Sequence, residues 1–439
     1  MFLLLIFLAS NILVSHGQKK YWSLEDCIAY ANQNNVSVQQ SEVQTRMNQL
    51  QLEQSKASQL PTLNASTNFG GQFGRSIDPT SNSFINSQIA YQSIGVQTGA
   101  TLFNWFRLKN TIKANELELQ ASEYTTDKLK NDISLNVIAA YMQMLLVIEQ
   151  KKIAENKIYL TTEQRKLTQK SVDAGALPEI NVAQLTAQLS TDSSALVENI
   201  GQIEQSKLQL KAILNLSSAV PFEVEITDID YIPLTPLSLL QPGDLYLRAL
   251  HHQPQQKADS LKIAAAEYRA EVAKSSMYPN VSAYGSSGTN YSTSFINPIT
   301  GHRYNYLSQL NTNLSQSVGI SLSVPIFNAK QAKTAYLTAK ENIHLQRLQQ
   351  SESNRQLEQV IYTAYNNAVT SIDKYEANIK AENYARYAFE LASKRYTIGM
   401  LSTSDYLTAL NNLSNAQTNK AIAHAESVFR IKVLEWYGR

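Results

Sequence analysis

The stretch KRYTIGMLSTSDYLTALNNL, from Lys394 to Leu413, decides the fold of this chain. Helical periodicity runs into it, breaks at Gly399 and resumes past Asp405, a pattern typical of two antiparallel helices joined by a short turn. The same break occurs once before, at Gly175 in the stretch DAGALPEINVAQLTAQLS, 224 residues upstream. The sequence therefore predicts a helical hairpin that is duplicated within one chain.

A pair of strands and a very long helix precede each hairpin turn. Apolar and polar residues alternate in strand pairs at about 62–103 and about 280–327, so each strand has one apolar and one polar face. Helical periodicity covers about 105–215 and about 329–437, and the first helix of each pair has about 68 residues, or ~100 Å. We therefore predict a mostly α, internally duplicated fold, in which each repeat is a β-hairpin plus very long antiparallel helices.

The loops between the paired strands differ in the two repeats. KASQLPTLNAS, from Lys56, matches KSSMYPNVSAYG, from Lys274, at an offset of 218, whereas residues after the strand pairs match at an offset of 224. Six extra residues therefore lie around the second loop, near Tyr291–Ser308. In that repeat the second strand is predicted to alternate as far as Ile326. The first loop, Arg75–Ile89, is polar and rich in turn residues, which predicts a long irregular connection.

The N-terminus has the features of a secretory signal peptide. An apolar run, Phe2–Leu8, is followed by small residues at Ser15 and Gly17, where a signal peptidase cuts. A membrane anchor is the alternative, but the run is interrupted and is shorter than the ~20 residues that cross a bilayer. We predict a signal peptide at 1–17, a first repeat at 18–215 that opens with a helix from a Ser23 cap to about Ser58, a mixed α/β segment at 216–243, and a second repeat at 244–439.

Composition and motifs argue against catalysis and against nucleic acid. The 38 basic and 36 acidic residues nearly balance, so no electrostatic footprint for a nucleic acid is present. The single cysteine, Cys27, is interpreted as a small buried thiol. His251 and His252 are adjacent and do not share a helix face, and the sequence has no metal-ligand cluster or nucleophile motif. We predict no catalytic residue, no metal site, no cofactor and no nucleic-acid partner.

The strands need partners from other chains. Four strands fall short of the roughly eight that surround even a filled barrel interior, and open sheet edges are not tolerated in lipid. Strands with an apolar face opposite a polar face suit a wall between lipid and water, so several chains are expected to pool their strands. Tyr91 and Tyr284 lie near strand ends and are candidates for interfacial girdle residues. A soluble β-hairpin packed on a helical bundle is the alternative.

Four stretches resemble the TolC-like outer-membrane efflux proteins over nearly the whole mature chain: WSLEDCIAYANQNN, KASQLPTLNAS, KSSMYPNVSAYG and RYTIGMLSTSDYLTALNNL. The resemblance implies a homotrimer, in which a twelve-stranded membrane β-barrel is continuous with a periplasmic α-helical barrel. It also implies the exit duct of a tripartite efflux or type I secretion system in the cell outer membrane, extending into the periplasm. Its expected partners are outer-membrane lipid, a periplasmic adaptor (membrane fusion) protein and an inner-membrane transporter.

The resemblance places the functional residues at the two turns, which form the periplasmic tip in this family. An acidic residue six past the glycine matches Asp405, and the first repeat offers neutral Asn181 there; Tyr396 matches a tyrosine that helps to close the pore. The family's closing arginine is replaced by Leu401. The alternative role for Asp405 is stabilisation of a helix start. The implied adaptor-docking tip comprises Gly175, Ala176, Leu177, Gly399, Met400, Leu401 and Ser402.

A second function of another class stays open at the level of sequence. An outer-membrane protein whose helices serve as a non-conducting structural or adhesive stalk has the same periodicities. Conductance in planar bilayers distinguishes the two, because a stalk need not conduct. Drug, metal and protein cargo are all compatible with a duct.

Overall fold

The computed structural model describes residues 21–77, 82–86, 88–226, 236–296 and 301–438. The predicted signal peptide and its cleavage site lie outside the described residues, as does part of the predicted mixed segment. The chain forms two units, which combine pieces of both sequence repeats. One unit comprises residues up to Ser41, Thr126–Gln253 and Asn354–Arg439, and the other comprises Glu42–Thr125 and Pro254–Ser353.

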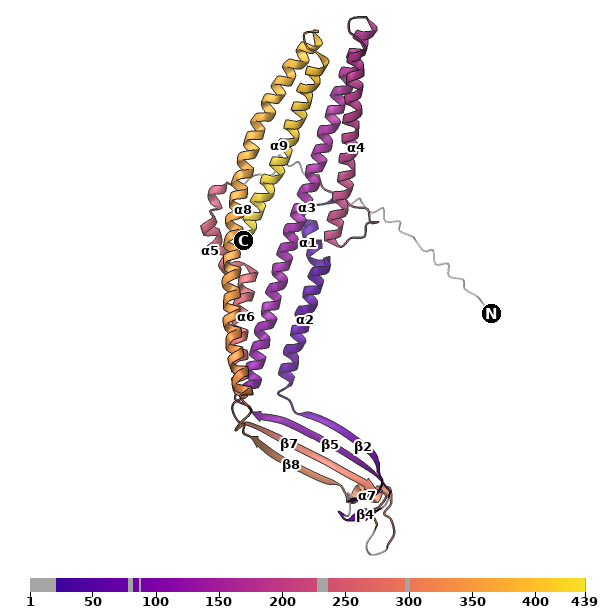
Figure 1. The fold of residues 1–439 in the computed structure, drawn as a ribbon, viewed down its shortest axis with the longest axis vertical. Coiled ribbons are helices and arrows are strands. Elements are labelled where there is room, and N and C mark those ends of the chain that lie inside the picture. Colours follow the sequence, from indigo (N-terminus) through magenta and orange to yellow (C-terminus); the bar gives the residue numbers. More distant parts are fainter. Residues whose placement is uncertain (1–20, 78–81, 87, 227–235, 297–300, 439) are drawn as a thin grey trace, which may run out of the picture. The chain divides into compact units, whose positions relative to one another are not determined.

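Helices make up most of the fold (Figure 1). The two longest, α3 and α8, have 67 residues each, or ~100 Å of helix, as the uninterrupted periodicity predicts. The bounds are α1 Leu24–Asn34, α2 Val36–Ala57, α3 Arg107–Asp173, α4 Ile180–Leu214, α5 Pro242–His252, α6 Pro254–Ser275, α7 Tyr306–Thr312, α8 Gln331–Thr397 and α9 Thr403–Gly438.

The helix predicted to run from Ser23 to about Ser58 is in fact two helices. Ser23 caps α1 as predicted, since its Oγ accepts a hydrogen bond from the Asp26 N–H. Asn35 then takes an extended conformation, and its side chain donates to the Ile213 carbonyl oxygen at 2.8 Å. Gln253, 218 residues later, takes the same extended backbone conformation between α5 and α6, and Pro254 follows it. The break is therefore part of the repeat.

Four antiparallel strands form the main sheet in the order β2-β5-β7-β8, as the two predicted strand pairs require. Their bounds are β2 Thr62–Gln72, β5 Ile89–Phe103, β7 Asn280–Ser292 and β8 Ser315–Ser323. The second strand of the second repeat ends earlier than predicted, before Pro325, which has no N–H to donate. The loop predicted to be irregular contains a short antiparallel ribbon, β3 Arg75–Ile77 with β4 Phe84–Asn86. A separate parallel pair joins β1 Tyr21–Trp22 to β6 Glu223–Val224.

One face of the main sheet is apolar and open. Three large apolar residues on this face are mostly exposed to solvent: Val318 is 89% exposed, Phe69 is 77% exposed and Leu63 is 74% exposed. On the opposite face two tyrosine rings lie over glycines, Tyr91 over Gly70 and Tyr284 over Gly319. The prediction that these two tyrosines are girdle residues is therefore wrong, because cross-strand register places them on the polar face.

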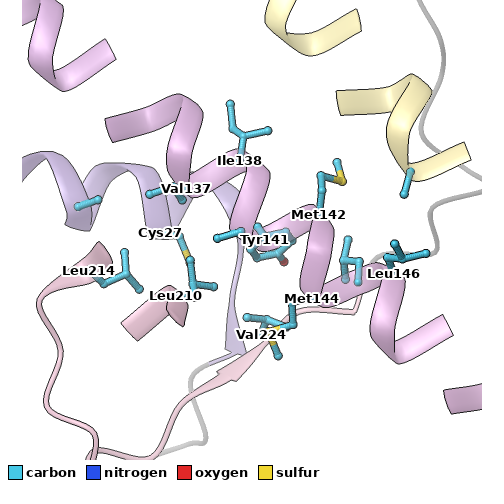
Figure 2. Close-up of a cluster of buried hydrophobic side chains, with 14 of the residues drawn as sticks. Cys27, Val137, Ile138, Tyr141, Met142, Met144, Leu146, Leu210, Leu214 and Val224 are labelled. Atoms are coloured by element: carbon cyan, nitrogen blue, oxygen red, sulfur yellow. The ribbon is translucent and has the colours of Figure 1, made fainter. Parts of the chain in front are cut away.

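The core of the first unit gathers where α3 passes α1, α4 and β6 (Figure 2). Cys27 and Val137 are fully buried there, and the Tyr141 hydroxyl donates to the Glu225 carbonyl oxygen at 2.7 Å. Burial, aided by Asp26, raises the pKa of the Cys27 thiol to about 12, so the thiol is neutral and inert. Among the described helices, only α3 is long and apolar enough to cross a membrane, and more than half of its apolar window is buried in the protein.

Candidate gate and docking site at the hairpin turns

The two long helices end in the same backbone motif. Gly175 and Gly399 have φ values of +74° and +77°, which strain any residue that carries a Cβ. The Ala176 N–H donates to the Ser171 carbonyl oxygen at 2.8 Å, and the Met400 N–H donates to the Arg395 carbonyl oxygen at 2.8 Å. These bonds close Schellman turns, so glycine is required at both predicted turns for a local reason.

Tyr396, in the last turn of α8, joins the two hairpins. Its ring is 8% exposed, and its hydroxyl lies 3.1 Å from Thr168 Oγ1 of α3 and 2.9 Å from Thr403 Oγ1 of α9. Both threonines are buried. Because a hydroxyl both donates and accepts, the three groups form a short chain of hydrogen bonds. The first hairpin is thereby tied to the second close to their turns.

Apolar side chains surround this hydrogen-bond chain. Tyr396 is buried with Leu185, Tyr406 and Leu410, and the rings of Tyr396 and Tyr406 have centroids 5.0 Å apart. Burial, with a smaller contribution from Tyr396, raises the pKa of Tyr406 to about 12, so the ring is neutral at physiological pH. Leu401 packs against this cluster at the position where the family arginine was expected. The side chain at this position therefore contributes apolar packing and no charge.

A groove of about 490 Å³ separates the two turns. It collects seven of the ten predicted gate and docking residues, whereas Gly175, Ala176 and Asp405 are not among its lining residues. The lining comes from both hairpins and is a mixture of apolar and uncharged polar groups. It comprises Leu177, Asn181, Gln184, Tyr396, Gly399, Met400, Leu401, Ser402, Thr403 and Ser404.

Asp405 lies in the first turn of α9 and is exposed. The Ser402 hydroxyl donates to Asp405 Oδ2 at 2.8 Å and accepts from the Asp405 N–H at 3.1 Å. This reciprocal pair caps the helix, and the negative carboxylate is also stabilised by the positive end of the helix dipole. The alternative role weighed from the sequence, helix-start stabilisation, is thus present. It leaves open a second role for the exposed charge.

Sequence reasoning missed Thr168 and Thr403. Thr403 follows Tyr396 by seven residues across a turn, but Thr168 is 228 residues from it, and no periodicity connects them. A contact between hairpins depends on tertiary packing alone. In the part of the chain that the structure describes, no group of three or more His, Cys, Asp or Glu side chains is arranged to hold a metal ion.

Comparison with known proteins assigns the chain. The model of the family described as outer membrane efflux protein matches residues 28–216 and 245–427. The chain belongs to the outer membrane efflux protein family. The outer membrane efflux protein BepC of Brucella suis is 21% identical over 339 residues, which cover 76% of this chain and 68% of BepC. The alkaline protease secretion protein AprF of Pseudomonas aeruginosa is 24% identical over 318 residues, 69% of this chain and 62% of AprF.

Solved structures of outer-membrane channels have the same fold as this efflux protein. The outer membrane protein VceC of Vibrio cholerae superposes with a TM-score of 0.75 at 17% identity, covering 94% of this chain and 96% of VceC. The CmeC outer membrane channel of Campylobacter jejuni superposes with a TM-score of 0.74 at 19% identity, covering 94% of this chain and 85% of CmeC. These structures show the fold, and membership of the outer membrane efflux protein family shows that the chain is an exit duct of the outer membrane that extends into the periplasm, so the stalk alternative is not favoured.

Proposed function

We propose that the efflux protein works as a passive homotrimeric duct whose periplasmic mouth is held closed by Tyr396. The sheet of one chain has four strands and two edges, β2 and β8, which lipid cannot satisfy. Three copies joined edge to edge, β8 of one chain to β2 of the next, supply twelve strands and leave no edge. The chain itself catalyses no reaction, because no nucleophile or metal motif is present in its sequence.

The observation that carries the gate is the hydrogen-bond chain Thr168–Tyr396–Thr403. It ties α3 to α8 and α9 through buried hydroxyls, at 3.1 and 2.9 Å. Separating the hairpins breaks the bond between Thr168 and Tyr396, because Thr403 belongs to the same hairpin as Tyr396, and this costs about 1 kcal/mol in each chain. Three copies of so modest a lock hold a pore shut and still allow a partner protein to open it.

The groove between the turns is the proposed docking surface for a helical hairpin of a periplasmic adaptor, which in turn meets an inner-membrane transporter. Ile398 and Met400 are 69% and 72% exposed beside it, large apolar side chains that serve as anchors in an interface. The uncharged polar lining, including Asn181, Gln184 and Ser402, offers hydrogen bonds to a helix laid in the groove. An adaptor seated there contacts both hairpins beside Tyr396.

The experiment is single-channel recording of Tyr396→Phe in planar bilayers. Phenylalanine keeps the buried ring but removes both hydrogen bonds, so we expect an open probability raised about fivefold for each kcal/mol of closed-state stabilisation lost. Tyr387→Phe is the matched control, because Tyr387 is on the same helix and 61% exposed. Equal currents in Tyr396→Phe and wild type would refute the gate. A trimer that conducts neither as wild type nor as Tyr396→Phe would refute the duct.

A further inference from the structure

The described part of the loop between β7 and β8, residues 293–296 and 301–314, is built on α7. Its helix start is capped by Asn305, whose Oδ1 accepts from the Ser308 N–H at 2.7 Å. Gln309 is 1% exposed, and its side-chain amide bonds the Ser292 N–H at 3.0 Å and the Tyr304 carbonyl oxygen at 3.1 Å. Loops on surfaces rarely bury such an amide, so the position of α7 on the sheet is well defined.

Three side chains show which face of the sheet α7 covers. Thr289 Oγ1 donates to the Leu310 carbonyl oxygen at 2.7 Å, Tyr291 packs edge-on against Tyr306, and the Tyr306 hydroxyl donates to Gln92 Oε1 at 2.7 Å. In the strand register Thr289 pairs with Ile94, and Gln92 pairs with Tyr291 and Phe69. Residues that pair directly share a face. The helix therefore lies on the apolar face of the sheet.

The amphipathicity of α7 is the reverse of that of a helix on a soluble protein. Polar groups of Tyr306, Gln309 and Asn313, at spacings of three and four, turn toward the sheet, and Asn313 Nδ2 donates to the Asn290 carbonyl oxygen at 2.8 Å. The other side presents Leu307, which is 74% exposed, and Leu314 beyond the helix end, which is 53% exposed. No residue of α7 is charged. In water this arrangement would expose the leucines without any compensating burial of apolar surface.

We propose that α7 is an interfacial foot on the outer wall of the barrel, which inserts Leu307 and Leu314 among the acyl chains of the outer leaflet. The inference rests on the outer-membrane placement of this duct. Because the helices of the duct extend into the periplasm, the strand loops at the opposite end of the sheet lie at the outer surface. Tyr291 on the apolar face of the sheet packs against Tyr306 of α7, so amphipathic rings of the kind found at a membrane boundary join this face to the helix that carries Leu307.

Spin labels on single cysteines in the full-length trimer test this proposal. Cys27 is the only cysteine, so Cys27→Ala gives the background. Labels go at Leu307→Cys, at Ile320→Cys on the apolar face of β8, and at His302→Cys, an exposed loop position. In vesicles of phosphatidylcholine and phosphatidylglycerol, we expect labels at 307 and 320 to be severalfold more accessible to oxygen than to a water-soluble nickel complex, with the reverse at 302.

Each outcome of this experiment is decisive. A label at 307 that is open to nickel while the label at 320 is not would overturn the foot and leave the duct intact. A label at 307 that is shielded from both probes would mean that a neighbouring protein copy covers α7, which also overturns the proposal. An aqueous label at 320 would instead contradict the membrane placement of the sheet. Gln309→Leu should release α7 and shift the 307 label toward nickel accessibility.

Discussion

At the scale of single residues, Ser402 and Asp405 combine a helix cap with an exposed negative charge. The two roles can be separated by replacing Asp405 with asparagine. Asparagine keeps a side-chain oxygen that accepts a hydrogen bond from the Ser402 hydroxyl, but it carries no charge. A trimer carries one Asp405 from each chain, and the equivalent position of the first repeat, Asn181, is neutral. We propose that the three carboxylates form a ring at the mouth that attracts cations.

Asp405→Asn should therefore reduce cation preference without unfolding the tip. The expected result is a shift of the reversal potential toward zero in a salt gradient, together with a melting temperature close to that of wild type. Asp173→Asn removes an equally exposed charge from the other turn and is the control. If the two variants show the same ion selectivity as wild type, Asp405 serves only the cap.

At the scale of elements, buried ion pairs set the register within each hairpin. Lys157 of α3 lies 2.8 Å from Asp192 of α4, and the Asp192 side chain is 1% exposed. Thr161 and Gln188 also hydrogen-bond the Asp192 carboxylate, at 3.1 and 2.7 Å. In the second hairpin Glu382 of α8 is held by Arg386 and, at 3.9 Å, by Lys420 of α9. Such a pair is satisfied at only one relative height of the two helices.

Asp192→Ala should destabilise the first hairpin strongly. Removal of one partner leaves the Lys157 ammonium ion unpaired and partly buried, at a cost of about 3 kcal/mol. Glu163→Ala breaks an exposed pair on the same helix, with Lys166, and should cost under about 0.5 kcal/mol. Thermal unfolding of the trimer in detergent, followed by circular dichroism, compares the two. Similar melting temperatures for both variants would show that the buried pair contributes no stability.

At the scale of the whole molecule, the duct is completed by other proteins. Ala176 and Met400 are exposed at the two turns, and Met400 also lines the groove. A photo-crosslinking residue at either position should capture the helical hairpin of the adaptor in cells that contain the complete pump. Tyr159 of α3, 62% exposed and 16 residues before Gly175, is the control and should capture no adaptor. Capture at Tyr159 alone would place docking elsewhere.

Periodicity, breaks and duplication were available from the sequence because they are local properties. The helices α3 and α8 contain no glycine or proline, and each ends at the glycine that a Schellman turn requires. The strand alternation likewise predicted a sheet with one apolar face, since side chains point to opposite faces with a period of two. The family resemblance then supplied the duct and the proposed position of its gate.

Only the tertiary structure decided which distant groups meet. The Thr168 hydroxyl hydrogen-bonds Tyr396, which is 228 residues away in the sequence, and no local sequence pattern predicts this contact. The Asn35 side chain at the break between α1 and α2 reaches the Ile213 carbonyl oxygen, and the Tyr284 ring lies over Gly319, which has no side chain to exclude it. For α7, periodicity alone shows two sides, but only the contacts with Thr289 and Gln92 show that the leucines face outward. Local geometry sets each element, whereas the packing between elements selects the face and partner of each side chain.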